Sequence, residues 1–368
     1  MKAQKGDTRI THHAALALTA SLVSVSAHAQ SSVQIYGIVD AAAAYVSNIA
    51  GHAAVQEISG IMNANRLGLR GSESLGSGVK AVFTLEGGFN INDGSMLQGS
   101  PGTTRFFGRQ SFVGLQFPWL TVTAGRQYDT MFDLLAYSAA PYMSSYWLRP
   151  GVASNLVGAN GSSADFDRLG GVRVDNSVKA VSTPINGWTF TSMFGLGGQP
   201  GTLSTGSTLS LGARYQGEAL GVGAAYTNFK EPNGSGNYVT WGAGASYRLA
   251  ELSFNALYTN TRFTPTADSV QVVEVGAHYQ LSPWLSVSAA YAFMLPNHDS
   301  SNVIIRGNRN QFGASIDYAF SKRTDVYAVA IRQQTAGGNP AQIFTLPSTG
   351  IGMGSAQTLV ALGLRHRF

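Results

Sequence analysis

The chain has 368 residues, of which 44 are glycine and none is cysteine, and its formal net charge is +5. Charged residues make up 12% of it, about half the share found in soluble domains. The lack of cysteine excludes disulfide frameworks and thiolate metal sites. Three cations and one acid lie within residues 1–29, so residues 30–368 have a net charge of about +3. So small a positive charge gives little support for a nucleic-acid partner.

Residues 1–29 have the organisation of a secretory signal peptide. The apolar stretch 14–25 is followed by a small-residue cleavage site, Ala27-His28-Ala29. The positive start before it consists of Lys2, Lys5 and Arg9. A spanning helix needs roughly 20 apolar residues, more than this stretch contains. The predicted division is therefore a signal peptide over 1–29 and one β domain over 30–368.

Most of the remaining chain alternates between apolar residues and small or polar ones, which indicates β-strands. In the last segment, one face carries Val360, Leu362 and Leu364. The other face carries Gly363, Arg365 and Arg367. Sixteen such segments are predicted, beginning near Val33, Asn65, Val79, Arg105, Leu120, Val172, Gly187, Ser207, Glu218, Tyr238, Glu251, Val270, Trp284, Asn310, Thr324 and Gln357.

Aromatic residues gather at the ends of the apolar faces, and short turns alternate with long polar loops. Outer-membrane barrels have short periplasmic turns and longer external loops. The predicted fold class is therefore all-β, a 16-stranded antiparallel transmembrane β-barrel. A barrel of this size is too wide for its side chains to fill and leaves an aqueous channel. The third external loop, 129–170, is predicted to fold inward, because so long a loop needs a surface on which to pack.

Signals of enzymatic chemistry are scarce. The sequence has no nucleophile-elbow, zinc-protease or P-loop motif, and its glycine-rich runs lack the spacing of a dinucleotide site. The histidines after residue 29 are widely separated: His52, His278, His298 and His366. We therefore predict no catalytic residues, no metal site and no cofactor.

Strand parity predicts a cluster of cations on the inner wall of the early strands. In the segment that starts at Asn65, Leu67 and Leu69 form the apolar face, so the cations beside them point inward. The predicted basic side of a pore constriction consists of Arg66, Arg70, Lys80, Arg109 and Arg173. The same parity places Asp175, Ser177 and Lys179 on the inner face with Arg173.

Asp129 and Asp133, at the start of the long loop, form the predicted loop side of the constriction. Acids are sparse between Asp133 and Asp165, which weakens this negative side. A positive wall opposite a weakly negative loop creates a transverse field, and the excess of cations favours anions.

Arg126 is in phase with the apolar face formed by Leu120, Val122 and Ala124. A charge directed outward near a membrane is costly unless it is paired. We therefore expect Arg126 to lie at a contact between subunits.

The sequence resembles the trimeric general-diffusion porins of β-proteobacterial outer membranes. The matching segments occur in the family's order along the chain. They are SVQIYGIVD (32–40), NRLGLRGSESLG (65–76), FGRQSFVGL (107–115), TAGRQYD (123–129), DNSVK (175–179), SKRTDVY (321–327) and GLRHRF (363–368).

This resemblance implies a homotrimer in which each barrel carries its own pore and loop 129–170 forms the constriction. It implies that Arg66, Arg109 and Arg173 line that constriction, and that Arg126 contacts a neighbouring subunit. It also implies that Phe368 is the signal read by the barrel-assembly machinery. The remaining expected partners are outer-membrane lipid, lipopolysaccharide, small hydrophilic solutes and anions.

The expected function is passive diffusion of small hydrophilic solutes through a weakly anion-preferring pore in the outer membrane of a Gram-negative bacterium. One alternative is a substrate-selective anion or carboxylate channel, which would show low, saturating conductance. Another is an outer-membrane enzyme, which would need a Ser–His pair. An adhesin would need its external loops but no open pore.

Overall fold

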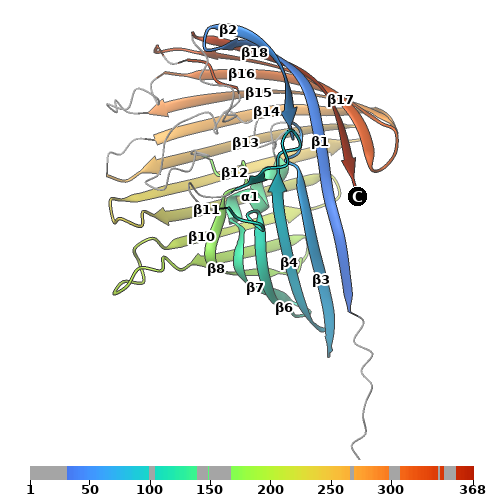
Figure 1. Cartoon of the computed structure of the whole chain (residues 1–368). Helices are drawn as coiled ribbons and strands as arrows, with labels where there is room; N and C mark the ends of the chain where they lie inside the picture. Colours follow the sequence, from blue (N-terminus) through green and yellow to red (C-terminus); the bar gives the residue numbers. More distant parts are fainter. Residues whose placement is uncertain are drawn as a thin grey trace, which may run out of the picture.

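The computed structural model describes residues 31–98, 104–138, 148, 167–265, 269–297, 307–338, 340–343 and 354–368. In it the chain forms one closed antiparallel β-barrel with a short helix, α1, against its inner wall (Figure 1). The predicted signal peptide lies outside the described residues. Within them, no helix is both long and apolar enough to cross a membrane.

The first strands are β1 (Ser32–Ile49), β2 (His52–Ser59), β3 (Arg66–Gly76), β4 (Val79–Phe89), β5 (Met96–Leu97), β6 (Gln110–Gln116) and β7 (Leu120–Tyr128). They are followed by α1 (Thr130–Leu135) and the 3-10 helix η1 (Ala136–Ser138). The remaining strands are β8 (Arg173–Ser182), β9 (Trp188–Gly195), β10 (Thr208–Gln216), β11 (Leu220–Lys230), β12 (Asn237–Leu249), β13 (Leu252–Phe263), β14 (Ser269–Ser282), β15 (Leu285–Asn297), β16 (Arg309–Ala319), β17 (Thr324–Thr335) and β18 (Ala356–Arg367).

These segments build sixteen barrel strands, because two of the strands are interrupted. Both β2 and β3 pair with β1, and both β5 and β6 pair with β4. The barrel closes where β1 pairs with β18, and Gly37 and Phe368 exchange backbone hydrogen bonds of 3.1 Å beside that seam. The predicted 16-stranded antiparallel barrel is confirmed. The predicted start of the second strand near Asn65 was late, because its first part is β2.

The outer face of the strands is apolar, as predicted. In β18, Leu362 is 65% exposed and Leu364 is 52% exposed. The inner face of the same wall is also apolar, which was not expected of a water-filled barrel. Leu359 and Ala361 face inward and are almost fully buried. Segments folded inside the barrel cover this wall, and they contribute the buried apolar side chains of Ile61, Met62, Leu148 and Ile343.

Residues 60–65, which separate β2 from β3, are held against this wall by the buried carboxylate of Asp40. It accepts hydrogen bonds from the backbone N–H groups of Met62 (3.1 Å) and Asn63 (2.7 Å) and from the Tyr327 hydroxyl (2.5 Å). Arg365 donates to the Asn63 side chain at 2.6 Å. The interruption of the second strand is therefore a fixed structure on the inner wall.

Helix α1 begins the long third loop and packs on the inner faces of β10 to β12. Asp129 caps it by accepting a hydrogen bond from the Phe132 N–H, and Ser210 of β10 accepts one from the Thr130 N–H. Gly212 makes room for the helix, because a Cβ atom there would lie 2.6 Å from Leu134. The loop from 139 to 166, apart from Leu148, lies outside the described residues, so its complete inward course remains a prediction.

Candidate functional site

The centre of the site is an ion pair on the inner wall between β4 and the start of β6. Arg109 Nε lies 2.6 Å from Glu86 Oε1, and both side chains are at most 4% exposed. The Tyr36 hydroxyl of β1 donates to the other oxygen of Glu86 at 3.0 Å. Arg109 was predicted from the sequence, whereas Glu86 was not.

Tyr128, at the end of β7, joins two of the predicted arginines. Arg109 and Arg173 each donate to its hydroxyl, at 2.6 and 2.8 Å. The Arg173 guanidinium also lies over the ring, 4.5 Å from its centroid, and Phe132 of α1 stacks on the ring at 4.3 Å. Two cations are thus fixed beside the start of the inward loop, and cation–π contact adds to the hydrogen bonds.

Arg66 completes the group, which we call the arginine cluster: Arg66, Arg109 and Arg173 with Glu86 and Tyr128. Its Nε donates to the carbonyl of Ala64 at 3.1 Å, and it lies close enough to the other charges to interact with them electrostatically. Three guanidinium groups therefore stand against one carboxylate. The cluster carries a net charge of +2, which attracts anions to this wall.

The other two predicted cations face the lumen away from this cluster. Arg70 donates from two nitrogens to Gln34 at 2.9 and 2.7 Å and lies over the Tyr36 ring. Lys80 is exposed at the turn end of β4, six residues from Glu86 and hence about 20 Å along the strand. The structure therefore places Lys80 at the mouth formed by the short turns, because parity fixes the face of a strand but not the depth.

Each of the two predicted loop acids is paired with a cation. Asp129 is fully buried and pairs with Arg168, while Asp133 lies 2.6 Å from Lys179 of β8. Burial raises the pKa of Asp133, and the nearby Lys179 ammonium offsets part of this rise. Both carboxylates are thus neutralised by cations that the sequence argument did not assign to them, which reduces the negative side of the predicted transverse field.

Arg126 lies in β7 opposite a bulge of β8, where two residues, Asp175 and Asn176, stand against this one residue. Gly125 has φ of +138°, and a Cβ atom there would lie 2.2 Å from the Ser111 carbonyl oxygen. The pairing of β7 with β8 shifts at this point because β8 has one extra residue between Val174 and Ser177, so parity fails in β8. Asp175 is exposed and pairs with Arg126 at 2.5 Å and with Arg105 at 3.0 Å, which corrects its predicted place beside Arg173.

Three buried glutamines anchor loop segments to the opposite wall. Gln311, Gln333 and Gln357 are paired in one row across β16, β17 and β18. Gln311 donates to the carbonyl of Leu148 at 2.6 Å, and Gln333 donates to Gln311 at 2.9 Å. The backbone N–H groups of residues 342 and 343 donate to Gln333 and Gln357, each at 2.6 Å. Parts of two external loops are therefore bound to the inside of the barrel.

Gln333→Leu is expected to release segment 340–343 and to increase the single-channel conductance in a planar bilayer. It removes two buried hydrogen bonds, so the free energy of unfolding should fall by about 2 kcal/mol. Gln334→Leu is the matched control, because Gln334 is exposed on the opposite face of β17. Equal conductance in the two variants would contradict a role of the glutamine row in narrowing the channel.

The sequence matches the family model described as Gram-negative porin over residues 14–338. The chain belongs to the Gram-negative porin family. Outer membrane porin protein 32 of Delftia acidovorans is 28% identical over 376 residues, covering 96% of this chain and 99% of that protein. An outer membrane porin protein of Bordetella pertussis is 25% identical over 398 residues, covering 93% of this porin and 96% of the relative.

Solved structures show the same fold. The anion-selective porin from Comamonas acidovorans superposes with a TM-score of 0.77 at 23% identity, covering 92% of this porin and all of that chain. The trimer form of OmpT from Vibrio cholerae gives a TM-score of 0.64 at 13% identity, covering 92% of this porin and 99% of that chain. This porin is thus of the β-proteobacterial type and forms a passive channel in the outer membrane of a Gram-negative bacterium.

Family membership also settles the enzyme alternative, because porins are channels. His278 Nδ1 and Ser288 Oγ do lie 2.9 Å apart on the inner wall. No carboxylate of the described residues hydrogen-bonds to that imidazole, so the pair lacks the third group that orients the base in a catalytic triad. In the same part of the chain, no three His, Asp or Glu side chains are grouped as metal ligands.

Proposed function

We propose that this porin conducts small hydrophilic solutes with a preference for anions, and that the arginine cluster determines this preference. The observation that carries the proposal is the excess of three guanidinium groups over one carboxylate at Tyr128. The loop acids do little to offset the positive charge of the arginine cluster, because Asp129 is paired with Arg168 and Asp133 with Lys179. Similarity to a solved porin named as anion-selective supports the same preference.

A general-diffusion pore is favoured over a substrate-selective anion channel. A selective carboxylate site needs donors that converge on one position, as bidentate arginines do. Here Arg109 and Arg173 direct nitrogens to the Tyr128 hydroxyl, and Arg70 directs two to Gln34. The cations therefore act through their field more than through a preformed binding site.

We propose that the porin assembles as a homotrimer and that Arg126 lies at the contact between subunits. With Asp175 and Arg105 it forms a partly exposed group at the loop end of β6 to β8, with one more cation than acids. A structural neighbour is described in a trimer form, which supports this assembly. An acceptor on a neighbouring subunit would satisfy the extra cation.

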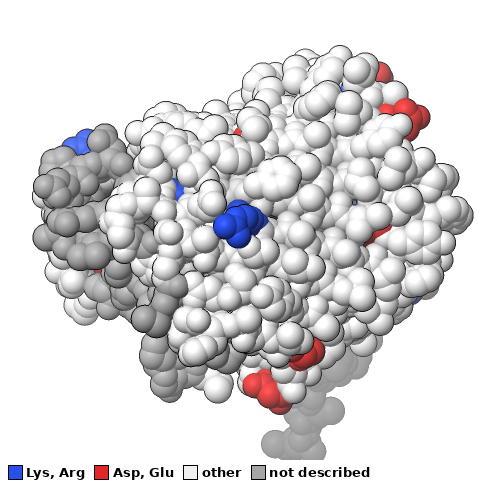
Figure 2. Space-filling view, turned by 90° about the horizontal axis from the view of Figure 1, so that it is seen from above, with Lys and Arg blue, Asp and Glu red and all other residues white. Residues whose placement is uncertain are grey.

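Phe368 is proposed as the signal for the barrel-assembly machinery. It is 43% exposed at the end of the closing strand and is bound to Gly37 of β1 through its backbone. The aromatic ring thus lies beside the seam between β1 and β18. Outer-membrane lipid and lipopolysaccharide are the proposed partners of the outer wall, where Figure 2 shows few and widely spaced charged residues on the face seen from above.

Reversal potential and single-channel conductance under a KCl gradient test the proposed function. Purified protein in a planar bilayer should give large ohmic steps. Its reversal potential should be shifted toward the equilibrium potential of chloride. Small steps that saturate and are blocked by an organic anion would instead indicate the substrate-selective channel. A reversal potential shifted toward the equilibrium potential of potassium would contradict the assigned role of the arginine cluster.

A further inference from the structure

Tyr128 is the uncharged member of the arginine cluster, and its hydroxyl oxygen lies where two guanidinium groups converge. Arg109 Nη2 donates to that oxygen at 2.6 Å, and Arg173 Nη2 donates to it at 2.8 Å. Charged donors that converge in this way are the means by which arginines hold the oxygens of a carboxylate, a phosphate or a sulfate. The phenol oxygen therefore takes the position that an oxygen of a bound anion would take.

The packing of the Tyr128 ring holds the hydroxyl in this position. The ring is buried, and Phe132 of α1 stacks on it with an angle of 24° between the two planes. The Arg173 guanidinium lies over the same ring. Lys179 fixes the backbone here, because its ammonium donates to the Tyr128 carbonyl at 3.0 Å. The ring therefore cannot turn away from the arginines without disturbing the start of the inward loop.

Acceptors within the protein leave few donors of Arg109 and Arg173 for an anion in the channel. Arg109 directs its Nε to Glu86 and its Nη2 to Tyr128. The Nε of Arg173 is buried and has no acceptor within the described part of the chain, so Tyr128 supplies the hydrogen bond that holds this guanidinium. Without the hydroxyl, both guanidinium groups would have a donor to direct at an anion.

We propose that Tyr128 determines the specificity of the arginine cluster, because its hydroxyl is a built-in acceptor that occupies Arg109 and Arg173 and keeps the channel from retaining oxyanions. Anions then pass through the field of the cluster without binding to it. This inference rests on the proposed anion preference and deepens it by naming the residue that separates a conducting wall from a binding site. Loss of the hydroxyl removes no charge but frees two donors, so the affinity for oxyanions should rise while the preference for anions is retained.

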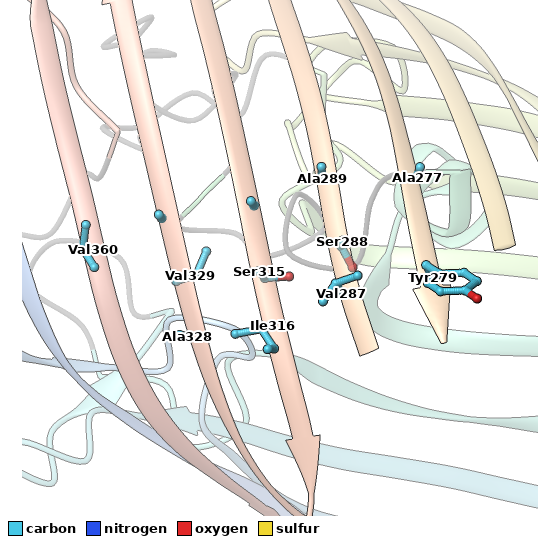
Figure 3. Close-up of a pocket in the computed structure, with 12 residues that line it drawn as sticks. Ala277, Tyr279, Val287, Ser288, Ala289, Ser315, Ile316, Ala328, Val329 and Val360 are labelled. Carbon is cyan, nitrogen blue, oxygen red and sulfur yellow. The ribbon is translucent and has the colours of Figure 1, made fainter. Parts of the chain in front are cut away.

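The shallow groove of about 520 Å³ on the outer face of strands β14 to β18 does not offer a second site for such an anion (Figure 3). Its described lining consists of apolar side chains, Tyr279 and two serines, and none of these residues is charged. The groove is also on the outer wall, whereas Tyr128 and its two arginines lie on the inner wall. Block of the channel current by an oxyanion therefore reports on the arginine cluster and not on this groove.

Block of the single-channel current by sulfate, added to a fixed KCl solution, tests this inference. Tyr128→Phe should lower the half-blocking sulfate concentration about tenfold, the effect of one additional charge-assisted hydrogen bond to the anion. Tyr128→Leu also empties the space between the two guanidinium groups and should lower that concentration further. Both variants should keep a reversal potential shifted toward the equilibrium potential of chloride, because neither removes a charge. Arg173→Gln added to Tyr128→Phe should reverse the gain in sulfate affinity.

Tyr327→Phe is the matched control for the loss of a buried tyrosine hydroxyl on the inner wall. An arginine, Arg365, also lies over the Tyr327 ring, at 5.9 Å from its centroid, but the Tyr327 hydroxyl donates to Asp40 and accepts from no described arginine. Unchanged sulfate block in both Tyr128 variants, or an equal gain in Tyr327→Phe, would overturn the inference. The reversal potential of the wild type tests the anion preference separately, so failure of this inference is distinguishable from failure of the proposed function.

Discussion

The combined substitution of Arg66→Ala and Arg109→Ala is expected to abolish the anion preference of this porin. Removing both guanidinium groups leaves Arg173 and Glu86, so the charge of the cluster falls from +2 to zero. The field at the inner wall then no longer favours chloride over potassium. The reversal potential under a KCl gradient should move to the value of an unselective pore.

Glu86→Gln, added to the double variant, should restore part of the anion preference. It removes the remaining acid and leaves Arg173 as a single positive charge. The same substitution should also recover stability, because a buried carboxylate that has lost its partner costs roughly 3–5 kcal/mol. The triple variant is therefore expected to unfold at a higher urea concentration than the double variant.

Lys80→Ala is the control for this series. Lys80 also faces the lumen, but it lies about 20 Å from Glu86 at the turn end of β4. Its loss should change the reversal potential much less than the loss of either cluster arginine. If the double variant kept the wild-type permeability ratio, or if Lys80→Ala had the larger effect, the arginine cluster would not be the selectivity element.

The positions of the strands could be predicted because lipid imposes one apolar side chain in two along each barrel strand. Most predicted starts lie within two residues of the observed ones, as at Val270 for β14 and Gln357 for β18. Strand β2 was not predicted from the alternation. Ile58, near its end, and the following Ile61 and Met62 are apolar on the inside, because loop segments cover that wall. The alternation that marks other strands is therefore blurred there.

The faces of the site residues could be predicted, but their partners could not. Parity placed Arg66 and Arg109 on the inner wall, where the structure has them. The pairing of Arg109 with Glu86, 23 residues away, depends on how neighbouring strands are aligned, which parity does not specify. Parity also fails at the bulge of β8 opposite Arg126, so Asp175, the partner of Arg126, was assigned to the wrong face.

Asp40→Ala is expected to lower the free energy of unfolding by at least about 3 kcal/mol. The carboxylate is fully buried and satisfies three donors, the N–H groups of Met62 and Asn63 and the hydroxyl of Tyr327. Each buried donor left without an acceptor costs roughly 1–3 kcal/mol. Urea unfolding of the refolded protein in detergent measures the difference.

Tyr327→Phe measures the contribution of the Tyr327 hydroxyl alone, because it removes that one donor and leaves the Asp40 carboxylate with its two backbone partners. It should cost about 1 kcal/mol. Asp93→Ala removes only one exposed hydrogen bond, from the Ser95 N–H, and should change stability much less. Since Asp40 holds residues 60–65 against the inner wall, Asp40→Ala should also make the conductance noisier by releasing that segment into the channel. If Asp40→Ala were as stable as Asp93→Ala and showed no more current noise, residues 60–65 would be held by the apolar contacts of Ile61 and Met62 and not by Asp40.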